Sequence, residues 1–137
     1  MQKIIIVGHG NFPSGILSAV SLLVGENENI IGLNLNGELT HEQFEEQLKS
    51  ILDQNDHAIV LADLTGGAPH QISARLVLES GNKNQYVISG VNLALIVDIV
   101  MKSLFGEVSD DELQDTLLKS IDECKETTTL LSARMMG

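Results

Sequence analysis

His9, the first histidine of the chain, stands between two glycines directly after the apolar run IIIV, residues 4–7. Such runs of β-branched and apolar residues are typical of strands buried on both faces. A histidine that serves only packing usually lies inside an element, whereas this one is presented where a buried strand ends. Asp63 closes a second apolar run, HAIVLAD, residues 57–63. If the two strands are neighbours, the imidazole and the carboxylate rise into one crevice.

A histidine paired with an aspartate can act as a nucleophile. The carboxylate accepts a hydrogen bond from one ring nitrogen, fixes the tautomer and leaves the lone pair of the other nitrogen free. Ser14 and Ser18 are possible neighbours, but neither lies in the G-x-S-x-G pattern of a serine nucleophile. The remaining histidines, His41, His57 and His70, are scattered without the spacing of metal ligands, so no metal site is predicted. The imidazole itself is the better candidate for the nucleophile.

The segment DLTGGAPHQ, residues 63–71, adds a place for an anion beside the imidazole. Gly66 and Gly67 allow the backbone to approach a ligand closely, and Pro69 suits the first turn of a helix. Free amides at a helix start, together with the positive end of the helix dipole, favour a phosphoryl group. The segment therefore predicts a phosphohistidine site, in which Asp63 contacts the ring N–H that faces away from phosphorus.

Apolar runs and helical stripes alternate along the chain and define the elements that position these residues. Four strands are expected at residues 3–7, 30–35, 57–63 and 85–90. Helices are expected from Pro13 or Ser14 to about Val24, from Thr40, from Pro69 to about Ser80, over residues 92–105, and from Ser109 onward. This alternation predicts an α/β fold, a three-layer sandwich with a mainly parallel sheet in the order 2-1-3-4. That order creates a switch point between the first and third strands, where ligands collect.

Finer expectations concern helix caps, helix faces and the tail. Thr40 with Gln43, and Ser109 with Glu112, have the spacing of a capping box. The first helix is expected to bury one stripe, and the last helix another. Those stripes are Ile16, Val20 and Leu23 in the first helix, and Leu113, Leu117, Ile121 and Cys124 in the last. The β-forming residues 127–131 predict a short terminal strand.

Composition sets the class of protein and its surroundings. The length of 137 residues suits one domain spanning residues 1–137, and a hydrophobic fraction of 43% is enough for a core. A formal net charge of −11 argues against binding to nucleic acid or to an anionic membrane surface. No apolar stretch reaches the roughly 18 residues of a membrane span, and the N-terminus lacks the pattern of a signal peptide. The single cysteine, Cys124, forms no intrachain disulfide, so a soluble cytoplasmic domain is expected.

Three segments together resemble one family. VGHG at 7–10, LADLTGGAPHQ at 61–71 and VISGVNLALIVDIV at 87–100 are similar to the mannose-type enzyme IIA components of the bacterial phosphoenolpyruvate:sugar phosphotransferase system. The resemblance implies a cytoplasmic phosphocarrier without a cofactor, which takes a phosphoryl group from HPr and passes it to a IIB component. It implies that His9 accepts the group at Nε2 and that Asp63 orients the ring through Nδ1. It also implies a homodimer in which residues 127–131 pair with the partner's sheet.

One residue departs from the family pattern. Many relatives carry serine between the second glycine and the proline, where its hydroxyl can contact the phosphoryl group, but this chain has Ala68. Alanine offers no hydroxyl and is a poor helix cap. Either the backbone amides of Gly67 and Ala68 suffice, or Thr65 supplies a substitute hydroxyl. We favour the amides.

Two other functions are compatible with parts of the pattern. A phosphotransfer subunit of a dihydroxyacetone kinase shares the fold and the histidine after the first strand, but DLTGGAP favours the sugar-transport branch. A non-catalytic α/β interaction or sensing domain needs no covalent chemistry; a nucleotide-binding version is disfavoured because GHGNFPSG lacks the P-loop pattern. Within the site, His70 is the rival to His9, while His41 and His57 are expected to be incidental.

Overall fold

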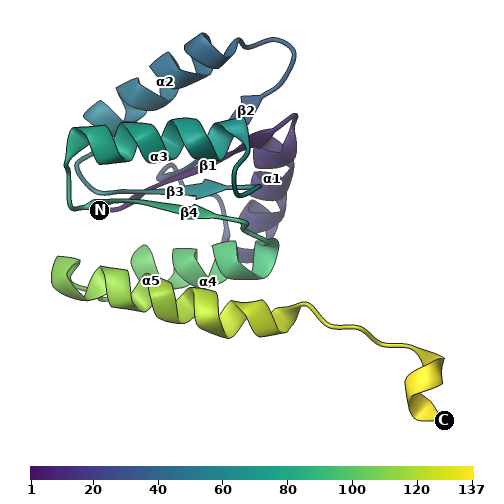
Figure 1. Cartoon of the computed structure of the whole chain (residues 1–137). Helices are drawn as coiled ribbons and strands as arrows, with labels where there is room; N and C mark the ends of the chain where they lie inside the picture. Colours follow the sequence, from purple (N-terminus) through teal and green to yellow (C-terminus); the bar gives the residue numbers. More distant parts are fainter.

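A computed structural model describes residues 1–137 and shows strands and helices in alternation (Figure 1). The four strands are β1 (Lys3–His9), β2 (Ile30–Leu35), β3 (Ala58–Ala62) and β4 (Gln85–Ser89). The five α-helices are α1 (Phe12–Val24), α2 (His41–Asp53), α3 (Ala68–Ser80), α4 (Leu93–Ser103) and α5 (Asp110–Cys124). Two short 3₁₀ turns, Lys125–Thr127 and Ala133–Met136, follow α5. The expected elements are present with ends shifted by a few residues, except for the terminal strand.

The four strands form one parallel sheet in the order β2-β1-β3-β4, which confirms the predicted order. β1 therefore has β2 on one side and β3 on the other. In the register of β1 and β3, Val7 lies beside Ala62, so the residues that follow each of them emerge at the same edge of the sheet. This edge, at the carboxyl ends of β1 and β3, is the predicted switch point.

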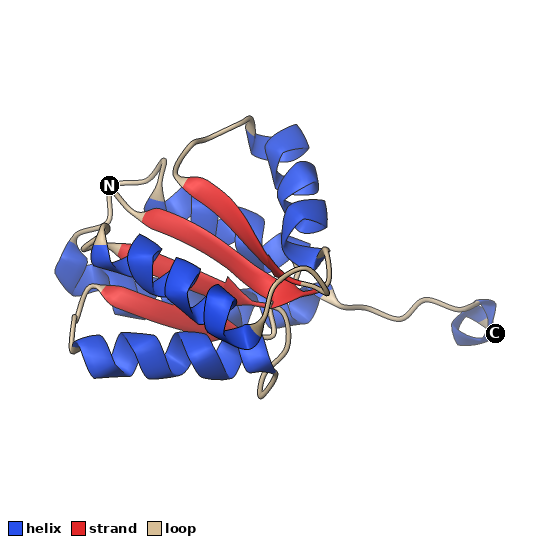
Figure 2. Ribbon diagram, turned by 90° about the horizontal axis from the view of Figure 1, so that it is seen from above, coloured by secondary structure: helices blue, strands red, loops and turns tan.

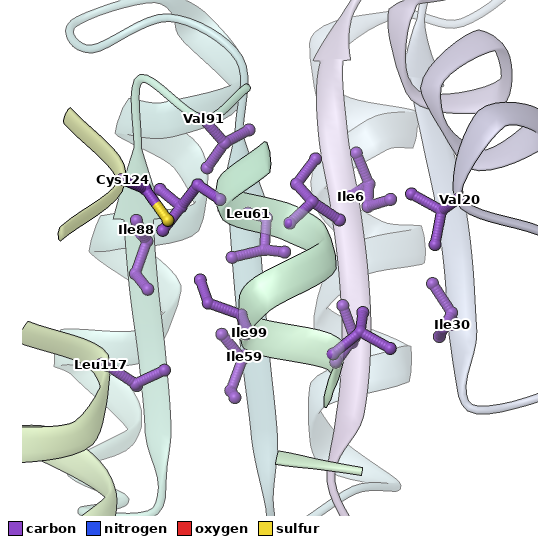
Figure 3. Packing of buried hydrophobic residues seen from close by; sticks show 14 of the residues in the cluster. Ile6, Val20, Ile30, Ile59, Leu61, Ile88, Val91, Ile99, Leu117 and Cys124 are labelled. Carbon is purple, nitrogen blue, oxygen red and sulfur yellow. The ribbon is translucent and has the colours of Figure 1, made fainter. Parts of the chain in front are cut away.

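Helices cover both faces of the sheet, and successive residues of β1 and β3 pack alternately against one face or the other. One apolar cluster joins the face carrying Ile4 and Ile6 to α1, α4 and α5, and Figure 3 shows part of it. The other joins the face carrying Ile5 and Val7 to α2 and α3. All five residues of β3 are buried, as expected of a central parallel strand. The sheet is thus fixed from both sides, and only its ends are open for chemistry. None of the helices is both long and apolar enough to span a bilayer.

The two predicted capping boxes had different outcomes. At Thr40 the box is complete: its hydroxyl accepts from the Gln43 N–H at 3.1 Å, and the Gln43 side chain accepts from the Thr40 N–H at 2.9 Å. At Ser109 the prediction was wrong. The Ser109 hydroxyl donates to the Glu112 carboxylate at 2.9 Å and caps no backbone N–H. The carboxylate competes with the amide for the same short side chain.

Both apolar stripes needed one correction. Leu23 is exposed, and Val24 packs on the core instead, because the four-residue spacing from Val20 keeps Val24 on the same side of α1. Ile121 is 37% exposed, and Ser120 is fully buried in its place. The Ser120 hydroxyl accepts from Lys102 Nζ at 3.0 Å, which satisfies the buried polar group.

The expected terminal strand does not form within the chain. Thr127 belongs to a 3₁₀ turn, and residues 128–132 pair with no strand. The C-terminal arm, residues 128–137, extends away from the body of the molecule and ends in a short turn (Figure 2). A β-forming segment becomes a strand only where a sheet edge is within reach, and this arm leads away from its own sheet.

Candidate phosphoryl-transfer site

The strand register brings His9 and Asp63 together at the carboxyl edge of the sheet. His9 is the last residue of β1, and Asp63 comes directly after β3. The Asp63 N–H donates to the Val7 carbonyl at 3.2 Å, which continues the pairing of β1 with β3 up to the site. The backbone of two buried strands therefore positions the two side chains.

A single carboxylate oxygen holds both the backbone and the ring of His9. Asp63 Oδ2 accepts from the His9 backbone N–H at 2.8 Å and lies 2.9 Å from His9 Nδ1. A carboxylate only accepts, so the ring proton is on Nδ1 and the lone pair of the neutral ring is on Nε2. The His9 side chain is 48% exposed and that of Asp63 only 13%. The ring that carries the Nε2 lone pair is thus half-exposed, while the carboxylate that orients it is sheltered.

The electrostatics keep Asp63 ionised. Burial has the largest single influence and acts to raise the pKa of this carboxyl, since it disfavours the charged form. The hydrogen bonds from the His9 backbone and ring, together with the charge that the ring can carry, outweigh burial and hold the pKa of Asp63 below its ordinary value. Asp63 Oδ1 accepts no hydrogen bond from the chain, so both hydrogen bonds from His9 to this carboxylate are made to Oδ2.

Two glycines leave just enough room for this pair. A Cβ at Gly8 would lie 2.9 Å from both Cγ and Oδ2 of Asp63. A Cβ at Gly67 would lie 2.6 Å from Cε1 and 3.2 Å from Nε2 of His9. The 2.9 Å and 2.6 Å distances are too short for a real Cβ. The backbone at Gly8 therefore packs on the carboxylate, and the backbone at Gly67 packs on the imidazole. Gly10, with φ of +58°, then turns the chain away after His9.

The loop between β3 and α3 uses its glycine amides internally. The Gly66 N–H donates to His70 Nδ1 at 2.9 Å, and the Gly67 N–H donates to the Leu64 carbonyl at 3.1 Å. By contrast, the N–H groups of Thr65 and of Ala68 donate to no group of the chain. The free amides near the start of α3 are therefore not the full set that the sequence suggested.

Thr65 is tied to a residue that the sequence analysis did not single out. Its Oγ1 lies 2.7 Å from Ser89 Oγ, at the end of β4. The only sequence signal for Ser89 was its place in the segment VISGVN, where the fourth strand ends. The pair of hydroxyls links the loop after β3 to the neighbouring strand.

The other candidates lie outside the pair. His57 precedes β3, at the end of that strand opposite to Asp63, and its Nε2 is 3.0 Å from Asp110 Oδ2. His41 is exposed at the first turn of α2. The hydroxyls of Ser14 and Ser18 donate to backbone carbonyls within α1 and its cap. Neither serine is hydrogen-bonded to His9. No three His, Cys, Asp or Glu side chains gather closely enough to hold a metal ion.

The fold and this geometry define an α/β protein with a carboxylate-held imidazole presented at the switch point of a parallel sheet. Comparison with known proteins agrees. Residues 3–118 match the family EIIA-man, described as "PTS system fructose IIA component". The chain therefore belongs to this family of phosphotransferase-system EIIA components, and the resemblance stated from the three sequence segments is confirmed.

Individual relatives show the extent of the likeness. The fructose-specific EIIA component of Bacillus subtilis is 28% identical over 104 residues, which cover 73% of this chain and 69% of the relative. The mannose-specific EIIAB component of Escherichia coli is 27% identical over 98% of this chain, which spans only 41% of that longer protein. The crystal structure of a phosphotransferase-system EIIA from Streptococcus agalactiae superposes with a TM-score of 0.79 at 36% identity. That superposition covers 90% of this chain and 94% of the other.

The contact between Gly67 and the His9 ring predicts a coupled effect on stability. Gly67 has φ of −72°, which alanine adopts freely, so Gly67→Ala strains no backbone angle and tests the ring contact alone. We expect a loss of about 1–3 kcal/mol in the free energy of unfolding, measured by urea denaturation. In the double variant with His9→Ala most of that loss should disappear, because the obstructing ring is gone.

Gly15→Ala is the matched control. Gly15 lies in α1 with no atom within 4 Å of the added methyl, so this change should leave stability equal or raise it. Equal losses for Gly67→Ala with and without the His9 ring would contradict the packing described here.

Proposed function

We propose that this protein is a cytoplasmic phosphohistidine carrier of a sugar phosphotransferase system. His9 accepts a phosphoryl group from phospho-HPr at Nε2 and passes it to a IIB component. The observation that carries the proposal is the 2.9 Å contact between His9 Nδ1 and Asp63 Oδ2, because it leaves the Nε2 lone pair on a half-exposed ring. Membership of the EIIA family supports the same reaction.

The transfer needs one bond to form and one to break. The Nε2 lone pair attacks phosphorus in line with the bond from phosphorus to the donor's nitrogen. The donor imidazole leaves with the electron pair of that bond. The proton on His9 Nδ1 stays in place, since it is held by Asp63. The phosphorylated ring carries more positive charge than the free ring, and the Asp63 carboxylate offsets it. Transfer onward to IIB repeats these steps in reverse.

The phosphoryl group would be received by the start of α3. The N–H of Ala68 donates to no group of the chain and follows Gly67, the residue that packs on the His9 ring. The dipole of α3 adds a favourable field for the negative charge. The amides of Gly66 and Gly67, included with Thr65 and Ala68 in the sequence-based expectation, already have partners. Of the two amides without a partner, those of Thr65 and Ala68, we assign the contact to Ala68, because it lies in the first turn of α3. The two glycines shape the loop.

The names of the relatives support the proposed partners. The Escherichia coli relative is named as an EIIAB component and is much longer than this chain, which aligns with less than half of it. The name EIIAB joins an A component to a B component, which supports a IIB component as the acceptor of the phosphoryl group. The family match also favours the sugar-transport branch over a dihydroxyacetone kinase subunit.

Phosphorylation by the general components of the system tests the proposal. After incubation with phosphoenolpyruvate, enzyme I and HPr, intact mass should show one added phosphate that is labile in acid and stable in base. His9→Ala should add none. Asp63→Ala should slow the reaction about 10- to 100-fold, the equivalent of one charge-assisted hydrogen bond.

His57→Ala is the matched control, because His57 also pairs with an aspartate but lies at the opposite end of β3. It should be phosphorylated as fast as the wild type. A phosphate that persists in His9→Ala, or one that disappears in His57→Ala, would overturn the assignment of the site.

We also propose that the C-terminal arm joins two copies into a homodimer. The arm pairs with no strand of its own sheet. It carries four exposed apolar residues, Leu130, Leu131, Met135 and Met136. Covering them on a second copy removes apolar surface from water.

In sedimentation velocity the full chain should be dimeric, and a chain ending at Glu126 should be monomeric. Leu22→Ser, which changes an exposed leucine on α1, should stay dimeric. A monomeric full chain would refute the dimer.

A further inference from the structure

One glycine of the site loop is held at both its backbone groups by side chains of α3. The Gly66 N–H donates to His70 Nδ1 at 2.9 Å, and the Gly66 carbonyl accepts from Gln71 Nε2 at 2.8 Å. Gly66 itself has φ of +87°, a conformation that glycine adopts readily and other residues rarely do. The peptide on each side of this residue is therefore fixed by the first turn of the helix that follows.

The position of this loop determines the space around the reactive nitrogen. Gly67, the next residue, packs so closely on the His9 ring that a Cβ there would lie 3.2 Å from Nε2. A movement of the loop by a few tenths of an ångström toward the ring would crowd Nε2, and a movement away would withdraw the Ala68 amide that follows. Loop position and access to Nε2 are thus coupled through direct contact.

The hydrogen bond also defines the chemical state of His70. Since Nδ1 accepts from a backbone N–H, the proton of the neutral ring is on Nε2. In this geometry neither nitrogen of His70 has a free lone pair, so His70 cannot serve as the phosphoryl acceptor. Its ring is half-buried, and its one polar contact within the chain is with the loop.

We infer that His70 is a positioning residue for phosphoryl transfer: by holding the Gly66 N–H it sets the loop against His9 and keeps Nε2 accessible. This inference rests on the function proposed above. It assigns a role to His70, the histidine of the segment DLTGGAPHQ, which the sequence analysis named only as the rival to His9.

Two substitutions separate the hydrogen bond from the bulk of the ring. His70→Asn keeps an acceptor, because the amide oxygen occupies nearly the place of Nδ1, but it lacks the ring. His70→Phe keeps the ring and lacks the acceptor. His41→Asn, at an exposed histidine on the first turn of α2, is the control for histidine replacement elsewhere.

Two readouts are needed. The first is hydrogen exchange of the Gly66 amide measured by NMR, which does not depend on phosphorylation. The second is the rate of His9 phosphorylation at varied concentrations of phospho-HPr, which separates kcat from KM. In His70→Phe we expect the exchange rate of the Gly66 amide to rise roughly five- to tenfold. We expect kcat to fall by the same factor while KM stays unchanged. His70→Asn and His41→Asn should stay within about twofold of the wild type.

The outcomes are distinguishable. Equal Gly66 exchange in the Phe and Asn variants, or a lower kcat for Asn than for Phe, would overturn the role of the acceptor and favour ring packing. An effect on KM alone would assign His70 to partner docking and would also overturn the inference. Absence of phosphate on the wild-type protein would overturn the proposed function, and the transfer role of His70 with it, even if the Gly66 amide follows the expected pattern.

Discussion

The hydrogen bond between His9 Nδ1 and Asp63 Oδ2 is the interaction on which the rest of the site depends. The same oxygen also accepts from the His9 backbone N–H, so one carboxylate fixes the chain direction, the ring orientation and the tautomer together. This arrangement is possible only because β1 and β3 are adjacent and parallel. It also requires bare backbone at Gly8, where any side chain would occupy the place of the carboxylate.

The apolar core and the site at the sheet edge have different structural roles. Apolar residues on both faces of the sheet make the strands rigid, and the central strand is buried throughout. The site is built instead from glycine-rich turns at the strand ends, where Gly10 and Gly66 have positive φ. Glycine loses more conformational freedom on folding than any other residue, and burial in the two apolar clusters offsets that cost. A rigid sheet can therefore present an imidazole from the end of β1, beside loops of low intrinsic stability.

The sequence allowed the architecture and the central pair to be predicted, because both follow from local patterns. Alternating apolar runs and helical stripes imply the parallel sheet, and parallel strands bring their carboxyl ends to one edge. What could not be predicted is where individual hydrogen bonds go. The amides of Gly66 and Gly67 looked available for an anion, yet side-chain and turn geometry gives both of them partners. The Ser109 cap failed for the same reason, since a nearby carboxylate competes for the hydroxyl.

Contacts between distant segments were equally beyond sequence patterns. Ser89 lies against Thr65 because β4 is next to β3, which no spacing along the chain reveals. The arm beyond Thr127 has strand-forming residues but no edge of its own sheet within reach, so its pairing depends on what lies outside the chain. The residue types of such a segment favour a strand, but a strand forms only where another strand is available to pair with it.

The central claim is that Asp63 reserves Nδ1 for a proton and leaves Nε2 for phosphorus. Two-dimensional NMR of the phosphorylated protein, labelled with ¹⁵N in its histidine rings, identifies which nitrogen of His9 is bonded to phosphorus. We predict phosphorus on Nε2, with the proton still on Nδ1. Phosphorus on Nδ1 of His9 would contradict the account, because that nitrogen could not carry the group and donate to Asp63 at the same time.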